Sequence, residues 1–269
     1  MTKEITIEAL RARLNGALLQ PGEEGYKQAS TAWNLHAQQS PALIVMAADV
    51  EDLIAAVQFA GDARMGVGVM ATGHGVGNPC NGGLLINTSG MRGVKVNPVS
   101  QTVLVEAGAL WNDVIPAAQA HGLAGLVGSA PHVGVVGYTL GGGFGYLGRK
   151  YGLNAASVTA ADIVTADGKL IHVSADEHAE LFRGLKGSAG NLGIVASLEF
   201  RLYPLISVYG GAVFYPAEQA REALGLYARW AVNLPDEITA AFAFMNIPPL
   251  PSVPAPLRGR SVVVIKGCY

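Results

Sequence analysis

The sequence predicts an α+β protein with a large domain over residues 1–206 and the beginning of a second domain over residues 207–269. The first observation behind this fold class is that short apolar runs and amphipathic helical segments alternate from residue 42 onward. The second is an excess of glycine: 21 of the 35 glycines in this 269-residue chain lie between residues 66 and 152. Because these glycines are interleaved with Val, Leu and Ile and show no three-residue period, we expect a packed fold and exclude a fibre or a disordered chain.

Composition and charge exclude several classes of protein. The formal net charge is -2 and lysine and arginine do not cluster, so we expect no nucleic acid partner. Cys80 and Cys268 are too few for a disulfide framework and lack metal-ligand spacing, so we expect no metal site. No uncharged apolar run reaches the ~18 residues of a membrane helix, and the acidic N-terminus lacks the apolar region of a signal peptide. We therefore expect a cytoplasmic protein with no membrane partner, whose oligomeric state the sequence does not reveal.

A β-α-β pattern opens the regular part of the chain. A short helix is expected over residues 6–15 and an apolar strand over residues 42–46. Asp49 can cap the helix that follows, whose apolar residues recur at helical spacing until Gly61. A strand over residues 66–70 completes the pattern. Three further strands and a helix are expected over residues 84–87, 94–96, 102–107 and 110–121.

The rest of the large domain combines an irregular stretch over residues 128–152 with a hairpin. Strands over residues 157–166 and 169–174 are joined by Asp167-Gly168, which favours a tight turn. A short helix is expected over residues 178–185 and a half-buried strand over residues 194–202, where apolar and polar residues alternate.

Pro204 marks the boundary with the second domain. Beyond it the sequence predicts a strand over residues 208–214, a helix over residues 217–232 and a strand over residues 261–265. We interpret residues 207–269 as the opening part of a second domain rather than a complete one.

The glycine stretch contains a formal G-x-G-x-x-G at Gly143, Gly145 and Gly148. The nicotinamide dinucleotide fingerprint needs a helix that opens on the last glycine, and residues 148–154 show no helical period. The alternative is a cradle of glycines over residues 134–145, in which backbone N–H groups approach a pyrophosphate or a flat ring without interference from Cβ atoms. Tight packing without a ligand is the third interpretation. We favour the ligand cradle, because so many glycines carry a large entropic cost if they serve turns alone.

His74 lies between Gly73 and Gly75, directly after the strand expected over residues 66–70. A single histidine is more often structural than functional. Two flanking glycines expose the ring and let a cofactor approach it, so the residues themselves leave both interpretations open.

Five segments in a fixed order resemble the FAD-binding domain of the vanillyl-alcohol oxidase superfamily, in particular its berberine-bridge-enzyme-like branch. The resemblance extends from about residue 20 to residue 206. It implies a PCMH-type FAD-binding domain of two α/β subdomains, followed by the start of an antiparallel-sheet substrate domain. The segments are P-A-L-I-V from Pro41, A-T-G-H-G from Ala71, V-E-A-G from Val105, G-V-V-G-Y-T-L-G-G-G-F-G from Gly134 and G-N-L-G-I-V from Gly190.

The resemblance implies that one loop wraps the flavin pyrophosphate, namely Ala71, Thr72, Gly73, His74 and Gly75. In the family the histidine of this loop is often bonded covalently to the flavin 8α carbon, so His74 is the expected attachment point, although Met70 replaces the loop's arginine. Some members form a second link through a cysteine in a C-P-x-V-G-x-x-G-H segment. Ala130 stands at the cysteine position here, so no cysteinyl link is expected.

Further positions match the family's cofactor contacts. Tyr138 replaces the histidine at the end of the same segment and is expected either to face the flavin as a hydrogen-bond donor or proton relay, or to pack as a structural aromatic. The resemblance places the remaining contacts at Ala130, Val135, Gly137, Gly141, Gly142, Gly145, Gly193, Ile194 and Val195. Histidines without a match are expected on the surface or polar rim: His36, His132, His172 and His178.

The activity implied by the resemblance is that of an FAD-dependent oxidoreductase. A small-molecule alcohol, sugar or amine gives a hydride to flavin N5, and O2 or another acceptor reoxidises the flavin. The family takes its general base from the substrate domain or the C-terminal segment, so no base is assigned. The alternatives are a catalytically inactive flavin-binding fragment and a nicotinamide-dependent Rossmann enzyme.

Overall fold

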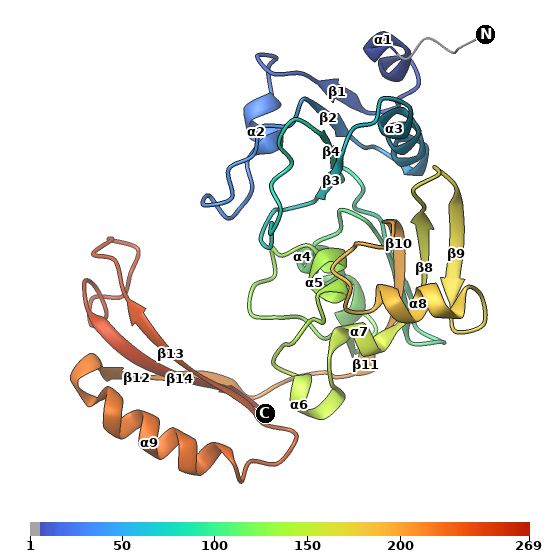
Figure 1. The fold of residues 1–269 in the computed structure, drawn as a ribbon. Coiled ribbons are helices and arrows are strands. Elements are labelled where there is room, and N and C mark those ends of the chain that lie inside the picture. The colour runs from blue at the N-terminus through green and yellow to red at the C-terminus, as the bar shows by residue number, and fades with distance from the viewer. Residues whose placement is uncertain (1–5) are drawn as a thin grey trace.

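The computed structural model describes residues 6–269, which form two sheets with a shared core and a third sheet set apart from them (Figure 1). The first sheet has the strand order β1-β2-β4-β3, in which β2, β3 and β4 are parallel and β1 is antiparallel. The carboxyl ends of the three parallel strands therefore meet at one edge. The strands are β1 (Ala17–Leu19), β2 (Leu43–Met46), β3 (Val67–Met70) and β4 (Leu84–Asn87).

The predicted β-α-β unit is present, with β4 inserted between its two strands. α3 (Val50–Asp62) connects β2 to β3, and the Asp49 carboxylate caps it by accepting a hydrogen bond from the Asp52 N–H, as predicted. The helix runs through Gly61 to Asp62, because this glycine keeps a helical conformation. α1 (Ile7–Arg11) lies in the predicted N-terminal helix, whereas β1 and α2 (Tyr26–Ser30) are too short to produce a periodic pattern and were not predicted.

The second sheet is antiparallel throughout, with the strand order β5-β6-β10-β8-β9. β8 and β9 form the hairpin predicted at Asp167-Gly168, and Gly168 adopts a φ of +72° in its turn. β10 pairs with β6 on one side and with β8 on the other, as the middle strand of the sheet. The strands are β5 (Val94–Asn97), β6 (Thr102–Glu106), β8 (Val158–Val164), β9 (Leu170–Ser174) and β10 (Ile194–Arg201).

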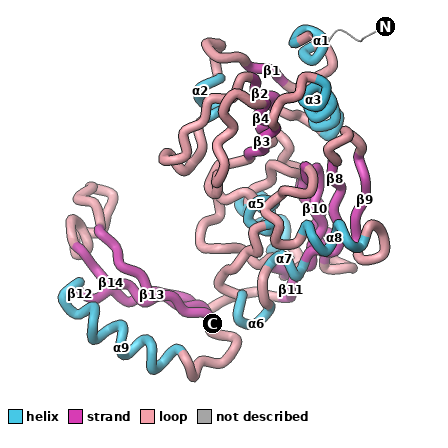
Figure 2. The backbone as a smooth tube through the Cα atoms, viewed as in Figure 1, coloured by secondary structure: helices cyan, strands magenta, loops and turns pink. Residues whose placement is uncertain are grey.

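The glycine stretch over residues 128–152 is mostly loop, as predicted, but it also contains helices that were not predicted (Figure 2). α5 (Val135–Leu140) buries its apolar side chains against the second sheet, and its six residues are too few for a helical period to stand out in the sequence. The other elements around this sheet are α4 (Trp111–Gln119), α6 (Gly148–Tyr151), α7 (Asn154–Ser157), α8 (Ala179–Leu185) and the pair β7 (Leu123–Ala124) and β11 (Tyr203–Pro204).

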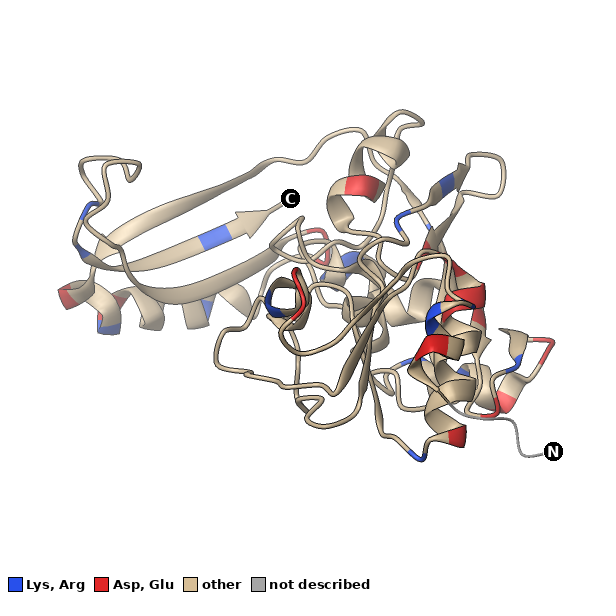
Figure 3. Cartoon of the chain, turned by 90° about the horizontal axis from the view of Figure 1, so that it is seen from above, with Lys and Arg blue, Asp and Glu red and all other residues tan. Residues whose placement is uncertain are grey.

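The third sheet has the order β12-β14-β13 and carries α9 (Ala220–Ala231) on one face (Figure 1). Tyr227 of α9 packs on Phe242 with ring centroids 5.7 Å apart, and its hydroxyl donates to the Ala240 carbonyl at 3.0 Å. The long strands carry few charged residues (Figure 3). The predicted strands and helix of this region are present, while β13 was not predicted. The elements are β12 (Gly210–Pro216), a 3-10 helix (Ala217–Gln219), β13 (Thr239–Asn246) and β14 (Ser261–Cys268).

The first two sheets share an apolar core. Ile86 of the first sheet lies in one buried cluster with Val164 and Ile194 of the second. A neighbouring cluster surrounds Trp111 and Phe200, which are fully buried and have ring centroids 5.8 Å apart. Burial of each such side chain contributes about 1.5–3 kcal/mol, so the shared core holds the two sheets in one arrangement. Within the described residues, no helix has the length and apolar character needed to cross a membrane.

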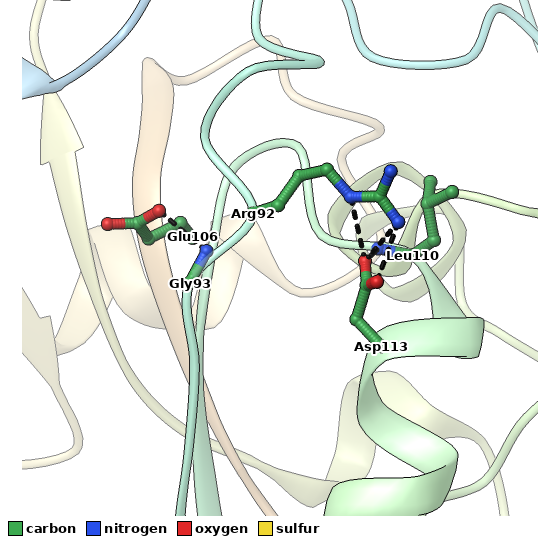
Figure 4. A network of polar contacts seen from close by, with 5 residues as sticks. All are labelled: Arg92, Gly93, Glu106, Leu110 and Asp113. Carbon is green, nitrogen blue, oxygen red and sulfur yellow. Dashed lines mark hydrogen bonds and ion pairs between the residues drawn. The ribbon is translucent and has the colours of Figure 1, made fainter.

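A polar network holds the start of α4 (Figure 4). The Arg92 guanidinium donates to the Asp113 carboxylate from Nε at 3.0 Å and from Nη2 at 2.6 Å. The Leu110 N–H donates to the same carboxylate at 2.8 Å, and the nearby Gly93 N–H donates to Glu106 at 2.7 Å. Partial burial raises the pKa of Asp113, but the hydrogen bonds from Arg92 and Leu110 outweigh it, so this pKa lies below its ordinary value.

We expect Asp113→Asn to lower the free energy of unfolding by about 1 kcal/mol at neutral pH, because a charged cap is lost. The folded-state pKa of Asp113 lies below the unfolded value of about 3.9, so the carboxylate's contribution is complete above that value. It is lost as the pH falls through the folded-state pKa. Urea unfolding between neutral and strongly acidic pH checks this, with Asp176→Asn at an exposed position as the control. A wild-type advantage that stays constant down to strongly acidic pH would contradict the assignment.

Candidate functional site

Three glycine-rich segments meet around α5: the loop over residues 71–75, the cradle over residues 134–145 and the loop over residues 187–193. A Cβ at Gly134, where α5 begins, would stand 3.6 Å from Ala71 Cβ and from the Thr72 hydroxyl, both in the loop after β3. At the other end of the helix, the Ala189 N–H of the loop over residues 187–193 donates to the Leu140 carbonyl at 3.2 Å. The loop after β3 also leaves the carboxyl edge of the parallel sheet, where open α/β sheets bind ligands. Loops that are far apart in sequence therefore surround one short helix.

Gly73 fixes the loop after β3 against the segment that follows α2. Its φ is +72°, and a Cβ there would lie 2.6 Å from both the Cα and the Cβ of Ala32. The Trp33 N–H donates to the Thr72 carbonyl at 3.0 Å, and the Asn34 N–H donates to the Gly73 carbonyl at 3.2 Å. Because any side chain at position 73 would force these two backbones apart, glycine is required here for packing.

His74 is half-buried between two other rings. The Trp33 indole lies nearly parallel to its imidazole, with centroids 4.4 Å apart and an interplanar angle of 15°. The His132 ring approaches to 5.1 Å at a tilt of 43°. His74 Nδ1 shares a hydrogen bond with Thr72 Oγ1 at 2.8 Å, whereas Nε2 is buried and has no hydrogen-bond partner among residues 6–269. All four residues line a cleft of about 870 Å³.

The surroundings of His74 favour its uncharged form. Burial lowers the pKa of His74, and the positive charge that His132 can carry lowers it further. In a neutral imidazole one nitrogen carries the proton and the other carries a lone pair. The hydrogen-bond partner of one nitrogen therefore determines whether the other is a donor or an acceptor. The lowered pKa of His74 therefore favours an uncharged imidazole at neutral pH, and within residues 6–269 this imidazole has one hydrogen bond, to Thr72.

The glycines of the predicted cradle fall into two structural classes. A Cβ at Gly143 would meet an aromatic ring at 2.7 Å, and one at Gly145 would lie 1.9 Å from the Val127 carbonyl oxygen, so packing requires both glycines. Gly137 is exposed, and a Cβ there would meet no atom within 4 Å. Gly141 is also exposed, and its nearest contact would be a backbone oxygen at 3.4 Å. Gly137 and Gly141 are thus the exposed glycines of the cradle, and they leave an open face along α5 and its C-terminal end.

The remaining residues predicted to contact the cofactor can meet a ligand mainly through their backbone atoms. Gly193 adopts a φ of +148°, and Gly142 adopts a φ of +110°. Ala130, ahead of α5, is half-buried, and Gly75 is exposed. The core buries three predicted side chains, so only their backbone groups can face a ligand: Val135, Ile194 and Val195.

Tyr138 packs inward from α5. Its ring meets Trp111 edge-on, with centroids 5.6 Å apart, and its hydroxyl donates to the Leu126 carbonyl at 2.9 Å. Burial raises the pKa of Tyr138 to about 12. These contacts favour the packed aromatic over the proton relay, and a catalytic role for Tyr138 stays a prediction.

Two aromatic residues of the site were not identified from the sequence. His132 is exposed, as expected, but it also lies beside His74, and its place two residues after Ala130 is the only sequence signal that pointed to this region. Trp33 carries no sequence signal at all, because it approaches His74 only through the folded backbone. The other three unmatched histidines are exposed, as expected: His36, His172 and His178.

The interpretation of Gly143, Gly145 and Gly148 as a nicotinamide dinucleotide fingerprint is wrong for this chain. Residues 141–147 form turns and loop, and α6 begins only at Gly148 and ends at Tyr151, so it is four residues long. The long helix that would open on the glycines of a Rossmann site is absent from this described part of the chain. Residues 6–269 likewise contain no group of three or more His, Cys, Asp or Glu side chains arranged to hold a metal ion.

Comparison with known proteins shows which family and which proteins this chain resembles. Residues 41–174 match the family described as the FAD binding domain. An FAD-linked oxidoreductase of Dictyostelium discoideum is 32% identical over 233 residues, which make up 86% of this chain and 52% of that protein. The (R)-6-hydroxynicotine oxidase of Paenarthrobacter nicotinovorans is 30% identical over 194 residues, 71% of this chain and 42% of that protein.

A solved structure shows the same likeness. The xylooligosaccharide oxidase of Myceliophthora thermophila, in complex with xylobiose, superimposes with a TM-score of 0.82 and 26% sequence identity. The match covers 97% of this chain and 55% of the oxidase. The chain thus spans about half the length of the relatives it matches.

The two classes of glycine lead to opposite expectations for alanine substitutions. We expect Gly145→Ala to lower the free energy of unfolding by about 3 kcal/mol, because its Cβ would collide with a backbone carbonyl. Gly137→Ala is expected to raise it by about 1 kcal/mol, because alanine is the better helix former and has free space there. FAD affinity should fall in Gly137→Ala, since the new Cβ projects from the open face of α5.

Urea unfolding without FAD and fluorescence titration with FAD check both expectations. Equal losses of stability in the two variants would contradict the division into packed and open glycines. Unchanged FAD affinity in Gly137→Ala would show that the open face is not where FAD binds.

Proposed function

We propose, on the premise that this chain carries the FAD binding domain of the FAD-linked oxidoreductases, that it holds FAD in the loops around α5 and oxidises a small organic molecule. The observation that carries the proposal is that the start of α5, a helix with an open face, lies against the loop that carries the half-buried His74, within the segment that matches the FAD binding domain. The face and the histidine come from segments about sixty residues apart, and the fold brings them together.

The residues of the site fit FAD in two respects. Exposed backbone at Gly137 and Gly141 admits a flat ring or a phosphate group to a distance that a Cβ would prevent. His74 Nε2 is a buried polar atom without a partner among the described residues, and buried polar atoms normally have one. A cofactor that lies along α5 and ends at His74 would satisfy both features.

The chain's own part in the reaction is to bind and orient. Bound FAD would supply an acceptor for the hydride of a substrate carbon. The loop after β3 and the open face of α5 would hold the cofactor, and the core shared by two sheets keeps these segments in place. The ring centroid of Tyr146, the residue after Gly145 of the glycine cradle, lies 5.5 Å from Lys266 Nζ of β14, so the third sheet approaches the segment that contains the cradle. No residue is assigned as the base.

We propose a sugar, an alcohol or an amine as the substrate, and O2 or another small oxidant as the acceptor. Relatives of the chain include an oxidase of (R)-6-hydroxynicotine and an oxidase of xylooligosaccharides, so the shared domain serves more than one substrate class. The sheet face opposite α9 carries the exposed Phe214, the buried Val264 and a single charged residue, Lys266. This mixed surface is compatible with an organic substrate that is partly apolar.

We also propose that His74 bonds FAD covalently and that no cysteinyl link forms. His74 lies in the loop after β3 and is uncharged at neutral pH, as a nitrogen nucleophile must be. Ala130 has no thiol to form a second link. The thiols of Cys80 and Cys268 are buried, which raises the pKa of each and makes them poor nucleophiles.

A flavin-binding chain without turnover is the second candidate. The observation that favours it is that Tyr138, the catalytic candidate named from the sequence, packs against Trp111 and donates its hydroxyl to the Leu126 carbonyl. Anaerobic addition of oligosaccharides, alcohols and amines to the FAD-loaded protein separates the candidates. Bleaching of the flavin absorbance by any of them supports the oxidoreductase, whereas stable absorbance with all of them supports the second candidate.

We expect the wild-type protein, purified with FAD, to stay yellow after acid precipitation, because the flavin is bonded to the chain. His74→Ala should bind FAD reversibly and release it on denaturation, since the nucleophile is missing. In-gel flavin fluorescence and the absorbance of the supernatant measure the two fractions. His36→Ala, an exposed histidine outside the site, is the matched control. Colour lost from the wild type, or retained by His74→Ala, would overturn the covalent assignment while leaving FAD binding itself intact.

A further inference from the structure

Lys266 of β14 is a half-buried cation without a carboxylate partner among residues 6–269. Its Nζ lies 5.5 Å from the ring centroid of Tyr146, which is within the range of a cation–π contact. An aromatic face attracts the positive charge but does not replace the acceptors that the three N–H groups of an ammonium ion require. Lys266 therefore keeps the capacity to donate hydrogen bonds to a ligand.

The acidic residues that precede β13 are engaged elsewhere. Asp236 lies 3.6 Å from the Arg149 guanidinium, and Glu237 lies 3.8 Å from Lys150 Nζ. These two pairs join the third sheet to α6 and leave Lys266 out. Within the described part of the chain, the positive charge of Lys266 is thus not neutralised by an acidic side chain.

The side chains directly opposite Lys266 are small. Lys266 pairs in register with Ala212 of β12 and with Ala241 of β13. Residues that are opposite each other on one face of a sheet have their Cβ atoms about 4.5–5.5 Å apart, so these alanines flank the lysine on both sides. Because each of them ends in a methyl group, neither can cover or pair with the ammonium group. The sheet face opposite α9 therefore leaves space around its one cation.

Two diagonal neighbours of Lys266 on the same face add features that suit a ligand. Thr239, which pairs with Cys268, is 7% exposed, and its hydroxyl has no hydrogen-bond partner among the described residues. Buried hydroxyl groups normally have a partner, and an anion held by Lys266 would offer this one an acceptor. On the other side, the ring of Phe214 is 42% exposed and can pack against an apolar group.

Tyr146 connects this cation to the glycine cradle. It directly follows Gly145, whose backbone is fixed against residue 127, since a Cβ at position 145 would lie 1.9 Å from the Val127 carbonyl oxygen. The contact between Tyr146 and Lys266 therefore joins the third sheet to the segment to which we assign FAD. A molecule bound to Lys266 would lie beside that segment.

We propose that Lys266 binds a carboxylate group of the substrate, so that the sugar, alcohol or amine to be oxidised is also an acid. This inference rests on the proposed function and makes its substrate class narrower. A single cation matches the single negative charge of a carboxylate, whereas a phosphate group carries close to two charges at neutral pH. Hydrogen bonds between ionised groups are also stronger than those between neutral groups, so Lys266 favours an acid over its neutral analogue.

The test is titration calorimetry with benzoate and benzamide, which have nearly the same shape and differ in charge. We expect the FAD-loaded wild type to bind benzoate about tenfold more tightly than benzamide, and a higher salt concentration to reduce this preference. Lys266→Met, which keeps the apolar stem, should lose the preference, and Lys266→Arg should keep it. Lys95→Met, at an exposed position of β5, is the matched control and should behave like the wild type. No preference in the wild type, or an equal preference in Lys266→Met, would overturn the inference.

A parallel titration with FAD separates this inference from the proposed function. A protein that binds no FAD contradicts the proposed function, and the benzoate preference of the same protein then still tests the anion site. A Lys266→Met variant that loses affinity for FAD but keeps its preference for benzoate would assign the cation to the cofactor. That result would overturn the inference and leave the proposed function standing.

Discussion

The close approach of two backbones at Gly73 is the constraint on which the site depends. Because a Cβ at this position would lie 2.6 Å from Ala32, the segment after α2 can rest on the loop after β3 only when residue 73 is glycine. This contact brings the indole of Trp33 over His74 and lets the Trp33 N–H reach the Thr72 carbonyl. The stacking, the hydrogen bond and the burial of the imidazole all follow from it. The excess of glycine in the sequence thus has its clearest physical meaning at one position.

Sequence patterns predicted those parts of the fold in which burial is periodic. The helix capped by Asp49 and the strand that begins at Ile194 were predicted because each repeats its apolar residues over several turns or alternations. The hairpin was predicted from its Asp167-Gly168 turn. The elements that were missed are short, such as α2 and β1, or have a weak alternation, such as β13. In those segments tertiary contacts, and not local preference, decide the conformation.

The site was predictable only in part, for a related reason. His74 was identified because its glycine neighbours and the family resemblance mark it locally, whereas Trp33 and His132 meet it only after three segments of the chain have folded together. The glycines are difficult for a different reason, because glycines with the same appearance in the sequence have different surroundings in the fold. Gly137 and Gly145 look alike in the sequence, yet one faces open space and the other lies against the carbonyl of Val127. A count of glycines cannot separate a ligand cradle from close packing, since both require the absence of a Cβ.

The contacts that position the third sheet are of a different kind from those that build the cradle. Arg149 of α6 donates to the Leu234 carbonyl at 2.8 Å and lies 3.6 Å from the exposed carboxylate of Asp236, and Lys150 lies 3.8 Å from Glu237. Exposed ion pairs of this sort contribute about 0–1 kcal/mol each, much less than the apolar core that joins the first two sheets. The geometry around His74 is therefore set by the core and does not depend on the third sheet. The function proposed above therefore assigns the cofactor to the part of the chain that a shared core holds, and the substrate to a sheet that this core does not include.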